Sequence, residues 1–469
     1  MGRPRRQMKK TGNNPVRAFT PKGKVLVILL RAIYRTLSLF VKIRHRQPKR
    51  LHHEDPARMS LKESLYLGSK YYLQAPEEVE SEWVKEYLDN QSYELDAPVN
   101  FVSQNIIRLS AAGDLMPYRM INHRACKKLW ERCGEYFFDA DIVFANLETP
   151  VNIKNPVSAV PEVMLSHMLF NADEEMFEVF SGMGKFKGYD VLSVINNHSL
   201  DQGEEGLKET MQFLKNKGIG YCGASLSRNE PRFSMIERKG IKVAFVGATF
   251  SLNQFQAPEG KSWMLNHIFL NDENCDLSRL KEDADLARAD GADMVVLSLH
   301  MGPAYQAYPG SIAIENMIKA CEITEAGLVI GTHPHHMQTF AVHRYQGKDG
   351  IDRKTPLLFS MGDFVACDIF SWGHGSLMMK AEIEKGCIGG ISHTRVKQMS
   401  LMPVYLKTEG KRGVETLEFI PLYDFEEFES EIKDSAVKKE WTALVEFSDT
   451  HIFKHEGTRS WLRKKIPAC

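Results

Sequence analysis

The sequence is poor in cysteine, and its positive and negative charges balance. Its 469 residues include eight cysteines, and no two of them form a Cys-x-x-Cys pair. This excludes a disulfide-dense scaffold and a cysteine-based zinc ribbon. The 60 basic and 60 acidic residues argue against a protein that binds nucleic acid over its whole surface. With 43% apolar residues the chain can bury a large core, which excludes a disordered, collagen-like or multi-spanning membrane protein.

The balanced total conceals a basic N-terminal arm, residues 1–50. Residues 1–53 hold 15 of the 60 basic residues and no acidic residue. Such arms bind anionic surfaces, either lipid headgroups or nucleic acid. The apolar stretch that begins at Val25 is interrupted by Arg31 and Arg35, which argues against a spanning helix, since that needs about 20 mostly apolar residues. The arginines, and the lack of an Ala-x-Ala cleavage site, also disfavour a signal peptide.

The arm has the pattern of an amphipathic helix. On a helix, its polar residues share one narrow face and the remaining surface is apolar; these residues are Lys24, Arg31, Arg35, Ser38 and Lys42. We therefore expect the arm to lie in the membrane interface, with the side of the membrane left open. The alternative is an arm that packs on a partner protein or on RNA, although the balanced charge of the whole chain argues against a nucleic-acid partner.

Three further parts follow the arm. Residues 51–100 predict a linker with short helices, residues 101–424 a main domain, and residues 425–469 a helical tail. In the main domain, apolar segments of strand length alternate with helical patterns such as residues 204–217. This alternation predicts an α/β fold with buried, mostly parallel strands.

The predicted strands end in polar clusters, where ligands bind in open parallel sheets. Carboxylate, amide and imidazole donors without thiolate suit Mn²⁺, Fe²⁺ or Zn²⁺, and six donors are enough for one or two ions. We expect His198 to be the general acid of such a site. The candidate ligands are Asp114, Glu148, Asn197, His300, His333 and His335.

Plainer roles exist for several of these residues. The chain has 16 histidines, so one histidine alone is no evidence of a site. Asp114 and Glu148 could each cap a helix, and Asp201 could shape its loop. His336 and Asp363 are open between the site and a structural role.

Six short motifs follow one another along the main domain. They are Gly113-Asp114-Leu115-Met116, Asn146-Leu147-Glu148, Asn196-Asn197-His198 with Asp201 and Gly203, His300-Met301-Gly302, Gly331-Thr332-His333-Pro334-His335, and Ser360-Met361-Gly362-Asp363-Phe364. In this order they resemble the capsule-synthesis protein CapA family, which is related to the calcineurin-like metallophosphoesterases. The resemblance runs from about residue 106 to residue 364. It implies a four-layer α/β/β/α sandwich around the site.

The resemblance also implies roles. It makes the six candidate ligands metal ligands and His198 the histidine that assists phosphoester cleavage, with support from Asn146, Asn196, Asp201 and Asp363. It further implies a link to poly-γ-glutamate, membrane anchoring, and polymer synthesis or export subunits as partners. Residues 376–383 and 402–406 read as antiparallel strands that complete the second sheet.

Three positions depart from the related patterns. Met116 stands where phosphoesterases carry the histidine of Asp-x-His, so one imidazole is missing. Glu148 stands where they carry an aspartate. Asp363 stands where the CapA pattern more often has asparagine.

Two functions follow as hypotheses. The first is a metal-dependent hydrolase or phosphoesterase-like enzyme that acts on a phosphoester or an anionic polymer with a metal-activated water. The second is a non-catalytic component that binds metal and polyanion in a polymer synthesis or export assembly. Retention of His198 favours the enzyme, and loss of the imidazole at Met116 favours the binding component.

Overall fold

The computed structural model describes residues 16–40, 54–73, 76–165, 168–410, 413–423 and 432–463. Its strands are β1 (Val102–Leu115), β2 (Ile142–Leu147), β3 (Val191–Ser193), β4 (Gly220–Cys222), β5 (Phe233–Arg238), β6 (Ile241–Thr249), β7 (Met294–His300), β8 (Leu328–Thr332), β9 (Phe340–Gln346), β10 (Asp352–Leu358), β11 (Asp363–Val365), β12 (Gly375–Ile388), β13 (Ile391–Glu409) and β14 (Thr416–Pro421). Its helices are α1 (Pro21–Phe40), α2 (Leu61–Tyr72), α3 (Glu82–Asp89), α4 (Gly134–Phe138), α5 (Glu174–Phe180), α6 (Gly203–Asn216), α7 (Ser278–Ala289), α8 (Ser311–Thr324), α10 (Ser435–Phe447) and α11 (Glu456–Ser460). Short helical turns are η1 (Ser262–Met264), η2 (Ser371–His374) and η3 (Ser448–Ile452).

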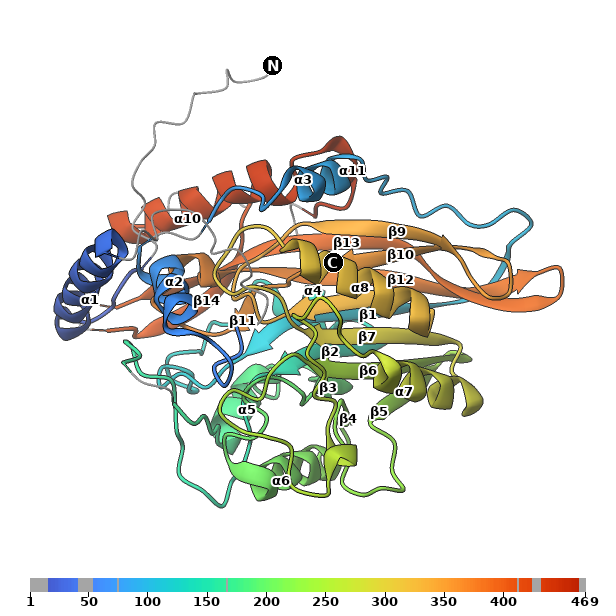
Figure 1. Cartoon of the computed structure of the whole chain (residues 1–469), viewed down its shortest axis with the longest axis horizontal. Coiled ribbons are helices and arrows are strands. Elements are labelled where there is room, and N and C mark those ends of the chain that lie inside the picture. The colour runs from blue at the N-terminus through green and yellow to red at the C-terminus, as the bar shows by residue number, and fades with distance from the viewer. Residues whose placement is uncertain are drawn as a thin grey trace.

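The strands form two mixed sheets that face each other (Figure 1). One has the order β14-β13-β12-β1-β2-β3-β4, with β11 also paired to β1, and the other has the order β5-β6-β7-β8-β10-β9. Strands β1, β2 and β3 run parallel, as do β6, β7 and β8. The predicted α/β class is confirmed, although both sheets are mixed rather than mostly parallel.

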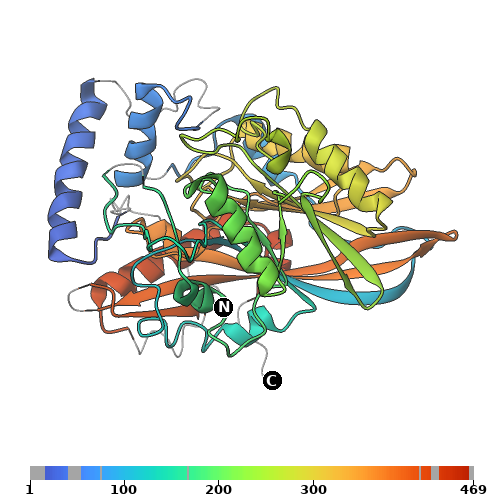
Figure 2. The same cartoon turned by 90° about the horizontal axis from the view of Figure 1, so that it is seen from below.

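Apolar side chains hold the layers together. Between the sheets, Phe144 stacks on Phe245 with ring centroids 5.1 Å apart. Helices α5 and α6 pack on the outer face of the first sheet, and α7 and α8 pack on the outer face of the second (Figure 2). Because β2, β7 and β8 are buried on both faces, their sequences are apolar runs, as parallel sheets require.

The expected place of the late antiparallel strands is wrong. Strand β12 pairs antiparallel with β1, and β13 pairs with β12, so both extend the first sheet. The physical reason is that the hairpin β9–β10 already occupies the edge beside β8 in the second sheet.

The segments before the main domain pack on it. In residues 54–100, Tyr71 and Tyr72 of α2 are buried in the core between the sheets, and Val84 and Leu88 of α3 lie among the side chains of the second sheet's outer face. Helix α1 contacts α2, and Lys42 of the predicted arm lies outside the described residues. Within the described ranges, no helix has the length and apolar character needed to cross a membrane.

Candidate metal centre

The loops after the parallel strands bring the predicted donors together. Asp114, near the end of β1, accepts a hydrogen bond from Asn146 Nδ2 at 2.7 Å and another from the backbone N–H of His333 at 3.1 Å. These bonds link β1 and β2 of one sheet to the loop after β8 of the other. Asp114 is fully buried, so the donors meet inside the protein.

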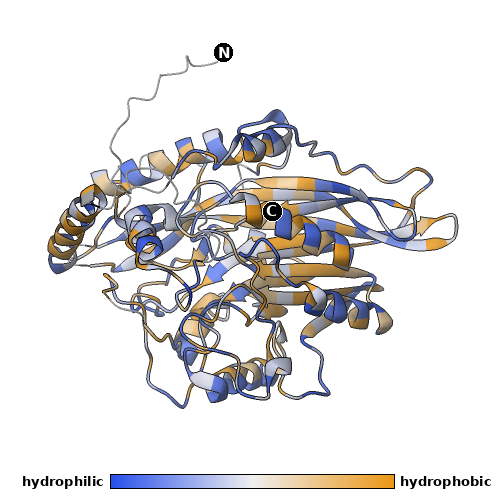
Figure 3. Ribbon diagram, viewed as in Figure 1, coloured by the Kyte–Doolittle hydropathy of each residue, from blue (hydrophilic) through white to orange (hydrophobic). Residues whose placement is uncertain are grey.

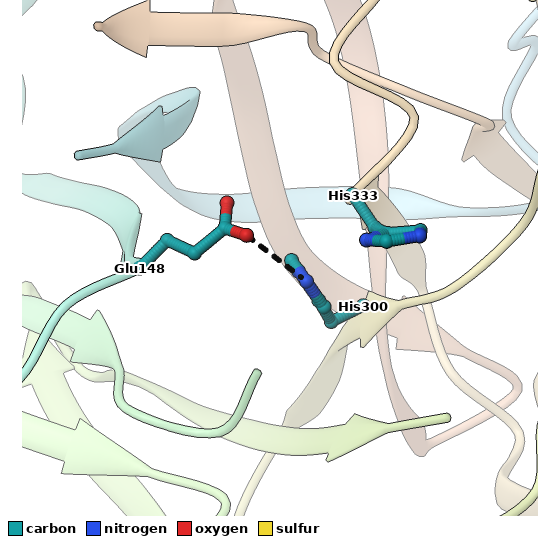
Figure 4. A group of neighbouring side chains, drawn as sticks. All are labelled: Glu148, His300 and His333. Atoms are coloured by element: carbon teal, nitrogen blue, oxygen red, sulfur yellow. Dashed lines mark ion pairs between the residues drawn. The ribbon is translucent and has the colours of Figure 1, made fainter. Parts of the chain in front are cut away.

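The first group of donors is Glu148, His300 and His333 (Figure 4), with one ligand atom of each within 4.8 Å of the others. His300 Nε2 lies 3.5 Å from Glu148 Oε1 and 2.8 Å from Asn197 Oδ1. On the other side of its ring, His300 Nδ1 lies 3.0 Å from Thr332 Oγ1, which orients Nε2 toward the group. Such outer contacts fix the orientation of a ligating imidazole.

The side chains of Glu148 and His333 have no hydrogen bonds in the described structure. Both carboxylate oxygens of Glu148 and both ring nitrogens of His333 are buried without a partner. Buried polar groups normally have partners, because an unmet donor or acceptor costs about 1–3 kcal/mol. Four such atoms beside one another fit a site that binds a cation.

The second group is Asp114, His335 and Asp363, whose ligand atoms also lie within 4.8 Å of one another. His335 Nδ1 is 2.8 Å from Asp363 Oδ1. Tyr305 stacks on the ring of His335 with centroids 5.4 Å apart, which holds the ring in place. The two groups adjoin, since the rings of His333 and His335 have centroids 5.5 Å apart.

The protonation equilibria reflect burial and crowded carboxylates. Burial, then the charges of Asp114 and Asp363, raises the pKa of Glu148 well above its usual range. Burial and Asp363 raise the pKa of Asp114 to about 6. Burial and neighbouring histidines lower the pKa values of His300 and His333, so both imidazoles are neutral, as metal ligands must be. Burial lowers the pKa of His335, but Asp363 outweighs it and raises that pKa to about 9.

His198 lies beside the donors with a partner of its own. Its Nδ1 is 2.6 Å from Asp201 Oδ2, which also accepts the backbone N–H of Phe170 at 2.7 Å. The Phe170 ring stacks on His198 with centroids 3.8 Å apart. Asn196 Oδ1 accepts the backbone N–H of His198 at 3.1 Å, so the supporting asparagine shapes this loop.

The loop after β8 is strained where it supplies its donors. His333 has a backbone φ of +97° and His335 has a φ of +53°, a region that residues other than glycine rarely adopt. Strain of this kind costs about 1–3 kcal/mol for each residue and clusters at functional sites. His336 turns away: its Nδ1 donates to Met337 O at 2.9 Å and its ring stacks on Trp372, so its role is structural.

Sequence reasoning missed two residues that orient the donors. Thr332 contacts His300, and Asn253 Oδ1 accepts from Asn197 Nδ2 at 3.2 Å. Thr332 ends β8 directly before His333, and Asn253 lies four residues beyond the end of β6. The available signal was that both residues are polar and lie at or just beyond the end of a buried strand.

Comparisons with known proteins show the family of the chain. The family model "Bacterial capsule synthesis protein PGA_cap" matches residues 108–367, more than half of the chain. The chain therefore belongs to this family.

Two relatives are named for capsule or PGA biosynthesis. The capsule biosynthesis protein CapA of Bacillus anthracis is 28% identical over 59% of this chain and 63% of its own length, less than two thirds of that protein. The PGA biosynthesis protein CapA of Bacillus subtilis is 25% identical over 66% of this chain and 77% of its own length. Among solved structures, the calcineurin-like phosphoesterase YfkN of Bacillus subtilis is similar with a TM-score of 0.34 and 11% identity, over 73% of this chain and 98% of that one.

Proposed function

We propose that this protein is a divalent-metal-dependent hydrolase, built on the four-layer α/β/β/α sandwich of metallophosphoesterases. The observation that carries the proposal is the buried pair Glu148 and His333, whose four side-chain polar atoms have no hydrogen-bond partner in the described structure. Four further donors lie beside this pair. Carboxylate and imidazole ligands suit Mn²⁺, Fe²⁺ or Zn²⁺. When bound, such ions stabilise charge on phosphoryl or carbonyl oxygens and acidify water.

The chain's own residues supply binding and proton transfer. The neutral imidazoles of His300 and His333, the amide oxygen of Asn197 and the carboxylate of Glu148 hold one ion. His198 is the general acid for the leaving group. Because its Nδ1 is bonded to Asp201, proton transfer falls to Nε2. The stacked ring of Phe170 keeps the imidazole from rotating.

The substrate class follows from the relatives' names and the donor chemistry. Both relatives are named for capsule or PGA biosynthesis, so we assign this chain to polymer biosynthesis of the same type. Its substrate is then a phosphoester or an amide-linked anionic polymer. Its partners are other subunits that synthesise or export that polymer.

The test is metal content together with turnover. The purified full chain is assayed for ions by mass spectrometry, and for hydrolysis of a generic phosphodiester and of poly-γ-glutamate. We expect bound metal in the wild type and in His198→Ala, with kcat about 10²–10⁴-fold lower in the variant. Bound metal without turnover of either substrate by the wild type would favour the non-catalytic, polyanion-binding component instead.

We also propose that α1 binds an anionic membrane surface. One side of α1 packs on the body, where Tyr34 stacks on Tyr72 with centroids 5.2 Å apart. The opposite side is apolar and exposed (Figure 3). Six of its large apolar residues are at least 36% exposed: Val25, Ile28, Leu29, Ile33, Leu37 and Leu39. Lys22, Lys24 and Arg35 are exposed on the same helix, as an anionic lipid surface requires.

The body holds α1 in a defined orientation. Glu162 accepts hydrogen bonds from the backbone N–H groups of Phe19 and Thr20, at 2.5 and 2.7 Å. Arg17 forms an ion pair with Glu440 of α10. The helix is therefore a fixed face of the protein, which supports docking of the whole body at the lipid surface.

Vesicle sedimentation tests the membrane proposal. The double variant Ile28→Asp/Ile33→Asp should lose binding to vesicles that contain phosphatidylserine. Leu286→Asp is the control, because Leu286 is also exposed, at 49%, but lies on a different helix, α7. Equal binding by both variants and the wild type would refute the assignment.

A further inference from the structure

The two donor groups of the metal centre differ in chemistry. The group of Glu148 has two imidazoles and one carboxylate, and the group of Asp114 has two carboxylates and one imidazole. Oxygen-rich sites prefer harder ions such as Mn²⁺ and Mg²⁺, whereas imidazole-rich sites suit Zn²⁺ and Fe²⁺. The carboxylate that makes the difference is Asp363.

Strand β11 carries Asp363 to the side of Asp114. The two residues are opposite each other in the parallel pairing of β1 with β11, and the backbone N–H of Asp114 donates to Gly362 O at 3.2 Å. A Cβ on Gly113 would lie 1.7 Å from Gly362 O, so only glycine permits this approach. Gly362 itself has φ +76°, which also favours glycine.

The contact between Asp363 and His335 has the spacing of two ligands on one ion. Neighbouring ligands of an octahedral ion bound at about 2.1 Å lie about 3 Å apart. The distance between His335 Nδ1 and Asp363 Oδ1 is 2.8 Å. One ligand atom of each of these two residues also lies within 4.8 Å of a carboxylate oxygen of Asp114.

Met116 explains why a further donor is needed here. It stands two residues after Asp114, and its backbone N–H donates to Val365 O at 3.1 Å, so it adjoins the same strand β11. Its buried side chain packs in an apolar cluster and offers no imidazole. Asp363 is thus the donor beside the position from which the imidazole is missing.

We propose that Asp363, together with Asp114 and His335, is a ligand of a second, oxygen-rich metal subsite. This subsite selects a hard divalent ion such as Mn²⁺. This deepens the proposed function and rests on its metal centre. In the competing role, Asp363 only orients the ring of His335 as a hydrogen-bond acceptor. An asparagine could still accept that hydrogen bond, but it would not supply the anionic ligand.

The experiment is calorimetric titration of the chelator-treated full chain with Mn²⁺, with the bound ions counted by mass spectrometry. We expect two ions in the wild type. Asp363→Asn should weaken one ion at least tenfold and leave the other unchanged. Asp352→Asn, which changes an exposed aspartate in β10, should bind both ions as the wild type does.

A second variant tests whether an imidazole can replace the carboxylate of Asp363. Met116→His/Asp363→Asn supplies an imidazole for the lost carboxylate, and should regain the second ion with its preference shifted from Mn²⁺ to Zn²⁺. Three results would each overturn the subsite. Asp363→Asn could bind two ions with unchanged affinity, a folded variant could lose both ions, or the double variant could fail to bind a second ion. A wild type that binds no ion would instead refute the proposed function.

Discussion

Two buried glutamates in this molecule have opposite surroundings. Glu440 of α10 contacts His374 and forms an ion pair with Arg17. Although burial raises the pKa of Glu440, its contacts with His374 and Arg17 outweigh burial and lower it. Glu148 has carboxylates as neighbours, and burial and their charges raise its pKa. Among the described residues, neither of its oxygens has a hydrogen-bond partner.

We interpret Glu440 as a structural charge and Glu148 as part of the proposed metal centre. Glu440 joins residue 17, the turn η2 and α10, and its charge is balanced by groups of the chain itself. The nearest basic group to Glu148 is His300, 3.5 Å away, and burial keeps that imidazole neutral. The folded environment of Glu148 therefore favours its charged form only when a cation arrives from outside. The comparison therefore predicts opposite behaviour for matched substitutions at the two positions.

The largest expected effect is on metal binding and turnover. Glu148→Gln removes an anionic ligand and should lose the ion of its group, with kcat lowered at least 10²-fold. Glu440→Gln should keep both the ions and the turnover, because neither Glu440 nor its partners Arg17 and His374 belong to the two donor groups. Ion counting by mass spectrometry and steady-state kinetics measure both variants side by side. Loss of ions from Glu440→Gln alone would reverse the roles assigned to the two residues.

The next effect is on the free energy of unfolding, which the two substitutions should change in opposite directions. Removing one partner of a buried ion pair leaves a buried charge uncompensated, so Glu440→Gln should destabilise the protein by about 3 kcal/mol. Glu148→Gln replaces a buried carboxylate that has no hydrogen-bond partner and should stabilise the chelator-treated protein by about 1 kcal/mol. Urea denaturation in the presence of chelator checks both values. Equal destabilisation by the two variants would contradict the comparison.

The smallest effect is on how the free energy of unfolding changes at acid pH. Because the pKa of Glu440 is lowered on folding, its contribution to stability is present above its ordinary value of 4.5 and is lost as the pH falls through the folded value. The difference in unfolding free energy between wild type and Glu440→Gln should therefore shrink below about pH 4.5. Denaturation curves from pH 7 to pH 3 measure it, and a constant difference would be evidence against the ion pairs.

The parts of this molecule that the sequence predicts are those set by local pattern. Asp114 and His300 stood out because each ends a run of buried, apolar residues, and a buried parallel strand has to be such a run. The helix at residues 204–217 was equally visible from its spacing, and the structure has α6 at Gly203–Asn216.

The rest depends on contacts between distant segments. No local signal pairs β12 with β1, or places Asp363 opposite Asp114, because pairing partners are chosen by the whole fold. The same holds for α1, whose pattern showed an amphipathic helix but not that one apolar side packs on Tyr72 of α2. Asn253 was missed because a lone asparagine in a loop is usually a turn residue.

The most direct test of the metal centre is anomalous diffraction from crystals grown with Mn²⁺, recorded on both sides of the manganese absorption edge. The account predicts a peak among the side chains of Glu148, His300 and His333, and a neighbouring one beside Asp114 and Asp363. Crystals that show manganese only at surface carboxylates, with Glu148 and His333 in contact with each other or with ordered water, would contradict it.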